Sequence, residues 1–411
     1  MSLLLALLAL LACRSGPRPA PSTAQVDTPA TGLPLRPPDT GVAAGLEGEP
    51  GLRPSPARHP LLAVDGQGFV VDVVEAPPPW SCDEGQAHSA LCVEDYRALA
   101  QGRFRGSARK LAACVDTTRD RLLALRQQVD RRGTRPRRGM DDAGLQRELR
   151  ERLRLDALAS EAPVHLSAGP VEDRGDHLQV DFVLWDPVVG RFPGRLLLPA
   201  VPVEAPGLLL LPGHMSEGGR QLDEMADRYH GRTLAAEGHA VLIIGFRAYD
   251  AGPAEYQAGL ELACAGLSLG ALRVHEATVA LDLLRALEPG EVVGERVGVL
   301  GHSGGAVWAV LLAAVEPVDA VVMDATSRQF LGVERSTDGA YVQVLDETLP
   351  ALVDLFDCVY SPGVPVPLED LACTRPPTPT PHLWVPYGYR AEDMARVRRF
   401  LGEALEARGS W

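Results

Sequence analysis

The run Gly301-His302-Ser303-Gly304-Gly305 carries the clearest chemistry in this sequence. It follows the apolar run Val297–Leu300 and begins a stretch with helical character. On such a strand-to-helix turn the serine backbone is strained, and larger side chains at the glycine positions would collide with the strand and the helix. The helix N-terminus and the amide of Gly304 would stabilise a developing oxyanion. The motif therefore predicts a nucleophile elbow, with Ser303 as the nucleophile of an acyl transfer.

The run Pro212-Gly213-His214-Met215 offers a second half of the oxyanion site. It follows the apolar run Leu208–Leu211, and in sheets with such an elbow the turn after an earlier strand supplies a second N–H donor. We expect the main-chain N–H of Met215 to be that donor. We expect His214 to orient this turn rather than to bind a metal or act as a base.

A serine nucleophile needs a histidine as its base and a carboxylate that orients the histidine. His382 is the only histidine that follows Ser303 in the sequence, and it is the candidate base. Its setting is unusual, because it precedes a predicted strand instead of lying in a loop after the last strand. We expect His302 to point away from the elbow and pack, and His275 to be structural on a helix.

The C-terminal tail allows two alignments, which place the acid differently. If residues 382–387 are the seventh strand, the acid follows Gly388 and the chain ends after one helix. If they are the eighth strand, the tail helix closes the fold, and Tyr387 or Tyr389 stands near the expected histidine position. Neither alignment supplies a histidine in the usual loop. The acid stays open among Asp370, Asp393 and Asp357, with Glu392 and Asp354 as further candidates.

From residue 163 onward, short apolar runs alternate with helical stretches. This alternation predicts an α/β fold, a doubly wound and mostly parallel sheet, opened by an antiparallel pair at 180–185 and 195–198. The expected parallel strands are Gly207–Leu211, Ala240–Gly245, Val297–Leu300 and Ala320–Met323. The expected helices are Gly219–Glu237, Leu272–Leu287 and Gly304–Val315.

Two segments precede this domain, which we place at residues 161–411. Residues 61–160 are predicted to be a small, mostly helical segment, with helices near 111–129 and 145–158 and a solvated basic loop between them. Residues 14–60 are rich in Pro and Gly, and we expect a disordered tether because so little apolar surface cannot offset chain entropy.

Residues 1–13 resemble a lipoprotein-type signal peptide. The apolar run Leu3–Ala12 is too short to span a bilayer, which needs roughly 20 residues, and Leu10-Leu11-Ala12-Cys13 is similar to a bacterial lipobox. This pattern predicts lipidation at Cys13 and an anchored protein of the cell envelope, on the periplasmic face or the cell surface. The alternative is an ordinary secretory signal, and both alternatives imply export.

Six cysteines follow Cys13, and an oxidising compartment would permit three disulfides. Proximity in sequence favours Cys82–Cys92 and Cys358–Cys373, although the connectivity stays open. No Cys-x-x-Cys motif or phosphate loop occurs, so we expect no metal and no cofactor. The net charge of −14 argues against nucleic acid as a partner.

With these motifs in order, residues 163–365 resemble the dienelactone hydrolase and acetyl xylan esterase group of α/β-hydrolases. The resemblance implies hydrolysis of a small-molecule or carbohydrate ester through an acyl-enzyme on Ser303. The matching pieces are Pro212-Gly213-His214, residues 234–242, Gly266-Leu267-Ser268-Leu269-Gly270, Ala280-Leu281-Asp282-Leu283-Leu284, and residues 295–300 leading into the elbow.

Two other functions compete with the esterase. One is a catalytically impaired α/β-hydrolase that binds a ligand or partner, which gains weight if no imidazole approaches Ser303. The other is a peptidase, since the same elbow also serves amide hydrolysis.

Overall fold

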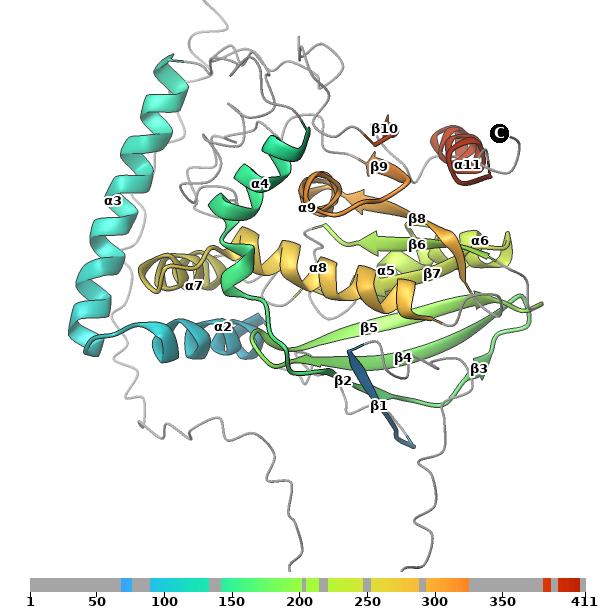
Figure 1. Cartoon of the computed structure of the whole chain (residues 1–411), viewed down its shortest axis with the longest axis horizontal. Helices are drawn as coiled ribbons and strands as arrows, with labels where there is room; N and C mark the ends of the chain where they lie inside the picture. Colours follow the sequence, from blue (N-terminus) through green and yellow to red (C-terminus); the bar gives the residue numbers. More distant parts are fainter. Residues whose placement is uncertain are drawn as a thin grey trace, which may run out of the picture. The chain divides into compact units, whose positions relative to one another are not determined.

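The central sheet of this chain has ten strands in the part that a computed structural model describes. That part comprises residues 68–75, 89–132, 142–201, 205–213, 221–246, 253–287, 293–324, 380–385 and 391–406. The strand order is β1-β2-β4-β5-β7-β6-β8-β9-β10, and β3 pairs with β4 beside this path (Figure 1). The strands are β1 Phe69–Val73, β2 Val164–Ala168, β3 Glu172–Asp173, β4 His177–Asp186, β5 Gly190–Pro199, β6 Ala205–Leu211, β7 Ala240–Ile244, β8 Val293–His302, β9 Ala320–Asp324 and β10 His382–Val385.

Strands β6 to β10 run parallel to one another, whereas β5 is antiparallel to both of its neighbours, β4 and β7. This arrangement confirms the predicted mostly parallel sheet with an antiparallel opening pair. The sequence explains this arrangement, because the apolar runs that form the central strands, such as Ala240–Ile244, are buried along their whole length. Strands of that kind have both faces covered by helices.

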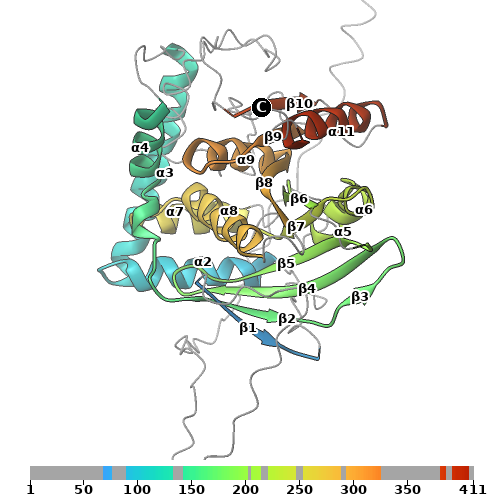
Figure 2. The ribbon, with the colours of Figure 1, turned by 45° about the vertical axis from the view of Figure 1, so that its right-hand side comes forward.

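Helices lie on both faces of the sheet (Figures 1 and 2). The sheet has a hydrophobic core on each face. On one face Val299 of β8 belongs to the same cluster of buried side chains as residues of α8 and α9, and on the other face Leu300 belongs to a cluster with residues of α5, α6 and α11. Alternate residues of one strand thus serve opposite layers, as the pleat requires. The helices are α2 Ser89–Arg103, α3 Ala108–Arg132, α4 Asp142–Leu153, η1 Leu155–Ala157, α5 Gln221–Asp227, α6 Gly231–Ala236, α7 Pro253–Cys264, α8 Leu269–Ala286, α9 Gly304–Val315 and α11 Ala391–Glu406. None of these helices combines the length and apolarity that a membrane crossing requires.

The single helix predicted over 219–237 is instead two helices, α5 and α6. The chain turns at His230, whose φ of 66° lies in the left-handed region. Gly231 then packs tightly, since a Cβ there would lie 3.0 Å from the carbonyl oxygen of Met225. The helical pattern of the sequence continues across this break, so periodicity alone could not locate it.

The described part of residues 61–160 contains helices α2, α3 and α4 and also a strand. β1 pairs in parallel with β2, with Phe69 opposite Val164, and forms the edge of the described sheet. The β-branched run Val70–Val71 favours this conformation, which the prediction of a mostly helical segment overlooked. Helix α4 ends at Leu153, before the predicted limit, because Arg154 adopts a left-handed conformation with φ of 52°.

A disulfide joins Cys114 of α3 to Cys264 at the end of α7. It ties the N-terminal helices to the main sheet domain. The predicted pairs Cys82–Cys92 and Cys358–Cys373 involve side chains outside the described residues, and they stay predictions. Residues 1–67, including Cys13 and the proposed tether, also lie outside the described part.

Candidate active site

Ser303 occupies the sharp turn between β8 and α9. Its φ of 50° and ψ of −116° place it in a region that side-chain-bearing residues rarely adopt. Its amide donates a hydrogen bond of 2.7 Å to the carbonyl oxygen of Asp324, which fixes the turn to the end of β9. Backbone strain of this kind persists only where neighbouring structure enforces it, and it is characteristic of a nucleophile elbow.

The glycines of the motif permit the close contacts that make this turn. A Cβ at Gly301 would overlap the carbonyl oxygen of Gly305, and a Cβ at Gly305 would overlap the carbonyl oxygen of Leu211. Strand β8, helix α9 and the end of β6 therefore approach one another at main-chain distance. The steric argument made from the sequence is confirmed at both positions.

The end of β6 lies directly against the serine. A Cβ built on Gly213 would be 2.7 Å from Ser303 Cβ and 2.7 Å from the carbonyl oxygen of His302. The main chain at Gly213 therefore lies beside Ser303. Gly304 is the first residue of α9, so its amide belongs to the helix N-terminus. Met215 and His214 lie outside the described residues, and their roles stay predictions.

His302 and Asp324 form a buried pair next to Ser303. They face each other across β8 and β9, and His302 Nδ1 lies 2.7 Å from Asp324 Oδ2. The imidazole also packs on the ring of Tyr229, with 3.9 Å between ring centroids. The expectation that His302 packs is confirmed. Asp324 was missed from sequence, although a carboxylate that ends the apolar run Ala320–Met323 beside the elbow strand was the available signal.

The register of β10 bears on the two alignments of the tail. β10 pairs directly with β9, which pairs with the elbow strand β8, so β10 is the second strand beyond the elbow strand. If the antiparallel pair β4 and β5 is counted as the first and second strands, β10 is the seventh, which agrees with the first alignment of the tail. His382 is opposite Val321, three residues before the level of Asp324. At about 3.3 Å per residue, the backbone of His382 is displaced by about 10 Å along the strand direction from the level of Asp324 and Ser303. His382 as the base stays a prediction that this register disfavours, and its side chain lies outside the described part.

Among the acid candidates, Asp393 is the one whose side chain the structure describes. It lies in the first turn of α11 and is buried, with Arg396 Nη1 3.7 Å from its carboxylate. Asp357, Asp370 and Asp354 lie outside the described residues, as does the side chain of Glu392. None of these assignments is decided by the described contacts.

His275 lies on α8, as expected, and contacts a carboxylate on the sheet. Its Nε2 is 3.2 Å from Asp186 Oδ2, while Asp186 Oδ1 accepts the amides of Val188 and Val189. Burial raises the pKa of Asp186, but the hydrogen bond and charge of His275 together with the two amides outweigh it, so the net pKa is lowered. Asp186 therefore stabilises the turn after β4 and attaches helix α8 to it, which is a structural role. Within the described ranges, no three side chains of His, Cys, Asp or Glu gather as metal ligands would.

No protein-family model matches this chain, and no curated relative matches it. Several esterases are among the solved structures that are similar to it. They include methylesterase BT1017, at 15% identity and a TM-score of 0.43, covering 64% of this chain and 63% of that protein. An acetyl xylan esterase from Paenibacillus sp. R4 has 15% identity and a TM-score of 0.39, covering 65% of this chain and 96% of that protein.

A glucuronoyl esterase from Solibacter usitatus has 14% identity and a TM-score of 0.31, covering 48% of this chain and 66% of that protein. The chain thus spans less than two thirds of the length of the methylesterase and of the glucuronoyl esterase. Its own strand order, with the elbow after β8, gives the chain an α/β fold of the α/β-hydrolase type.

Proposed function

We propose that this chain is a serine hydrolase that cleaves carboxylic esters through an acyl-enzyme on Ser303. The observation that carries the proposal is the strained turn at Ser303, with φ of 50°, held between β8 and α9. Strain at a side-chain-bearing residue costs of order 1–3 kcal/mol, and such outliers cluster at active sites. A serine that served only as a turn residue would gain nothing from this conformation.

The reaction follows from the arrangement around Ser303. Its Oγ attacks the ester carbonyl carbon, the carbonyl oxygen becomes negative, and the amide of Gly304 at the helix N-terminus stabilises that charge. The serine proton passes to a base and then to the departing alcohol, which leaves the acyl group on Oγ. Water then attacks the acyl-enzyme in the same way, releasing the acid and restoring the serine. The similarity of the sequence motifs to acetyl xylan esterases favours a carbohydrate or small carboxylic ester as substrate.

Labelling by a fluorophosphonate probe tests this proposal. Wild-type protein should be labelled and should hydrolyse acetyl esters, whereas Ser303→Ala should lose both properties. Ser167→Ala, which removes a serine from β2, is the matched control and should retain both. Equal labelling of wild type and Ser303→Ala would refute Ser303 as the nucleophile. A parallel panel of dipeptide amides distinguishes an esterase from a peptidase.

A ligand-binding protein without catalytic activity is the second candidate. One observation favours it, namely the register that sets the backbone of His382 about 10 Å from the elbow edge. A pure, folded wild type that neither reacts with the probe nor hydrolyses any ester in the panel would favour this candidate. Its pocket would then be sought by equilibrium binding of sugars and sugar acids.

The proposed location is the bacterial envelope, through a lipid on Cys13. The lipobox-like run Leu10-Leu11-Ala12-Cys13 motivates this proposal. Metabolic labelling with a radioactive fatty acid should mark the wild type and spare Cys13→Ala. An unlabelled wild type in the soluble periplasmic fraction would favour the ordinary secretory signal.

A further inference from the structure

One face of strands β1, β2, β4 and β5 carries a row of four side chains that reach solvent. The register places His165 opposite both Val70 and Trp185. Trp185 is in turn opposite Arg191. Directly paired residues point to the same side of a sheet, so these four side chains, which we call the cross-strand row, lie together on one face. Val70 is 39% exposed, His165 and Trp185 are half-buried, and Arg191 is exposed.

The opposite face of these strands is packed. Leu166, Leu184 and Phe192, each one residue along its strand from a member of the row, are fully buried in the main core. Successive side chains of a strand alternate between the two faces of the sheet. This part of the sheet therefore has one face on the core and one face toward water, as antiparallel sheets commonly do.

The polar atoms of the cross-strand row are not used by the fold. His165 and Trp185 contact each other edge to face, with 5.6 Å between ring centroids. Neither ring, nor the guanidinium of Arg191, makes a hydrogen bond or an ion pair with any residue in the part of the chain that the structure describes. The row thus presents aromatic surface and several N–H donors to solvent.

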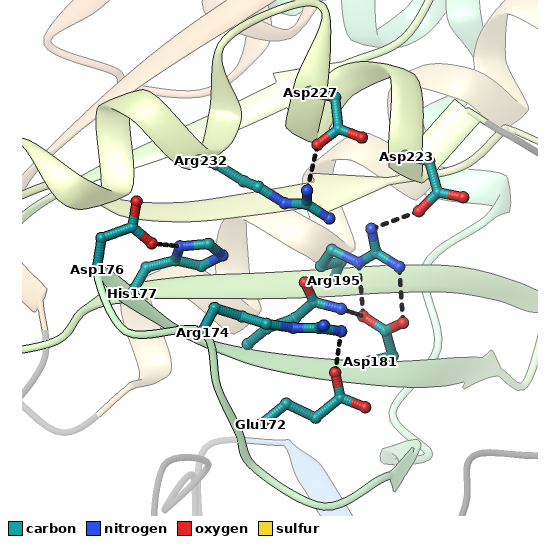
Figure 3. Close-up of polar contacts among 10 residues, drawn as sticks. Glu172, Arg174, Asp176, His177, Asp181, Arg195, Asp223, Asp227 and Arg232 are labelled. Carbon is teal, nitrogen blue, oxygen red and sulfur yellow. Dashed lines mark hydrogen bonds and ion pairs between the residues drawn. The ribbon is translucent and has the colours of Figure 1, made fainter.

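Arg195, the next arginine along β5 on the same face, shows the contrast. Its Nε donates to Asp181 over 2.6 Å and its Nη1 donates to Asp223 over 2.8 Å (Figure 3). Arg195 therefore joins β4, β5 and α5 and has a structural role. Arg191 carries the same fork of donors without such partners, so its donors are available to a ligand.

The cross-strand row lies at the same edge of the sheet as Ser303. One level of paired residues crosses from β8 to β4, namely Leu300, Leu210, Ile243, Arg195 and Asp181. β4 and β8 run in the same direction, because β5 is antiparallel to both of its neighbours. Ser303 is three residues beyond Leu300 and Trp185 is four residues beyond Asp181, so the two differ in level by about 3.3 Å. Four interstrand spacings, about 19 Å, separate their strands.

We propose that the cross-strand row is a subsite for sugar rings of a carbohydrate substrate, remote from the ester that Ser303 cleaves. The proposal rests on the proposed function and deepens it, because a substrate that reaches both places is an oligomeric or polymeric carbohydrate ester. A sugar ring has C–H groups on its faces and hydroxyl oxygens at its rim. The C–H face packs on the indole of Trp185, and the hydroxyl oxygens accept from Trp185 Nε1, His165 and Arg191.

This chemistry fits a carbohydrate better than a second copy of the chain. Three of the four side chains carry N–H donors, and Val70 alone is purely apolar. The core of a protein interface is depleted of charged residues, whereas ligand sites combine aromatic surface with a few polar groups that fix orientation. An acceptor-rich ring that is apolar on its faces satisfies both parts of the row.

Direct binding tests the row without catalysis. Wild type is titrated calorimetrically with hexaoses of xylose, glucose, mannose and galacturonic acid, and we expect it to bind at least one of them. Trp185→Ala should raise the Kd for that hexaose about tenfold, and Trp185→Phe, which keeps a flat ring, should stay within about threefold of wild type. Tyr256→Ala is the matched control. Tyr256 is a half-buried aromatic residue of α7 that packs beside Leu260, and its loss should leave the Kd unchanged.

Dependence on chain length links the row to the reaction. The substrates are the acetylated form of the hexaose that binds, the corresponding acetylated monosaccharide, and p-nitrophenyl acetate. For Trp185→Ala we expect kcat/KM on the hexaose to fall about tenfold, mainly through KM, because the lost contact is equal in the ground and transition states. The two short substrates cannot reach the row, so their kcat/KM should stay within about twofold of wild type.

The outcomes separate the two proposals. If the wild type hydrolyses none of the three esters, the proposed function fails, and hexaose binding still decides the role of the row. If the wild type binds no hexaose of the panel, or Trp185→Ala binds it as tightly as the wild type does, the subsite is overturned while the proposed function stands. An equal loss of kcat/KM on all three substrates would also overturn it, because that pattern indicates a structural role. A wild-type dimer that Trp185→Ala dissociates, with hexaose affinity unchanged, would assign the row to a second copy and overturn the subsite.

Discussion

Asp324 holds the turn at Ser303 through two separate groups, with its main-chain oxygen on the amide of Ser303 at 2.7 Å and its carboxylate on Nδ1 of His302 at 2.7 Å. Both contacts cross from β9 to the elbow strand β8. One carboxylate residue thereby fixes the position of the elbow and the ring of the residue that precedes the serine. The elbow is supported from the sheet as well as from helix α9.

Replacing Asp324 by alanine should impair both stability and catalysis. The change leaves the buried imidazole of His302 without its acceptor, which costs about 1–3 kcal/mol in unfolding free energy. We also expect kcat per titrated active site to fall about tenfold, because small displacements of a nucleophile are costly. Urea unfolding and active-site titration measure the two effects.

Asp319→Ala is the control for Asp324→Ala. Asp319 Oδ2 accepts the amide of Val297 at 3.0 Å, near the opposite end of the same strand pair. It should lower stability by a similar amount and leave kcat per active site unchanged. Equal kinetic losses in both variants would show that the role of Asp324 is confined to general stability.

Gly301→Ala should destabilise the protein strongly. The added methyl group would overlap the carbonyl of Gly305 and lie 2.5 Å from Ala306 Cα, and main-chain atoms cannot move aside cheaply. We expect a loss of about 3 kcal/mol, the upper range for overpacking, and slower labelling of Ser303. Gly402→Ala in α11 is the control, since a Cβ there meets nothing within 4 Å. That variant should gain about 0.5–1 kcal/mol from helix propensity, and a loss in it would contradict the reasoning.

These contacts also show which parts of the structure the sequence could predict. Continuous apolar runs located the buried strands, because segments such as Leu208–Leu211 and Ala320–Met323 are apolar throughout and lie between covering helices. The elbow was predictable because Gly301 and Gly305 are required by close approach of main-chain atoms. These are local constraints, and each restricts which residue types can occupy the position, so it can be recognised in the sequence.

The partners of Ser303 were not predictable, because they depend on register between distant segments. Asp324 meets His302 only because β9 pairs with β8 in one register. A carboxylate at the end of an apolar run marks a strand end, but it does not reveal which residue of another strand will lie opposite. His165, Trp185 and Arg191 form one row for the same reason, since β2, β4 and β5 pair in one register. The turn at His230 was missed for a related reason, since tight packing of Gly231 overrides a continuous helical pattern.

Acidification should selectively weaken the contact between Asp186 and His275. The folded-state pKa of Asp186 is lowered, so its carboxylate contributes stability above its unfolded pKa of about 3.9, and this contribution is lost as pH falls through the folded value. Asp186→Asn should therefore be about 1.5–3 kcal/mol less stable than wild type at pH 7, the range for hydrogen bonds to charged groups. The difference should shrink below about pH 4, as measured by urea unfolding across pH.

Asp116→Asn is the control for this pH dependence. Asp116 is exposed and pairs with Arg119 at 3.1 Å, so its removal should change the unfolding free energy by less than about 0.5 kcal/mol at any pH. A difference between wild type and Asp186→Asn that stays constant down to pH 3 would contradict the assignment of the stability to the ionised carboxylate.

Reduction of the disulfide between Cys114 and Cys264 should destabilise the chain, because the bond closes a loop with a sequence separation of 150 residues. Constraining so long a loop in the unfolded state stabilises the folded state by about 2–5 kcal/mol. The double variant Cys114→Ala/Cys264→Ala should show this loss under oxidising conditions, and dithiothreitol should then have less effect on it than on the wild type.

Because α3 packs on α7 through the residues around this bond, including Leu111, Val115 and Leu260, the loss should appear first in those helices. Hydrogen exchange would locate it, and uniform deprotection that includes β6 and β8 would show that the N-terminal helices and the sheet unfold as one cooperative unit.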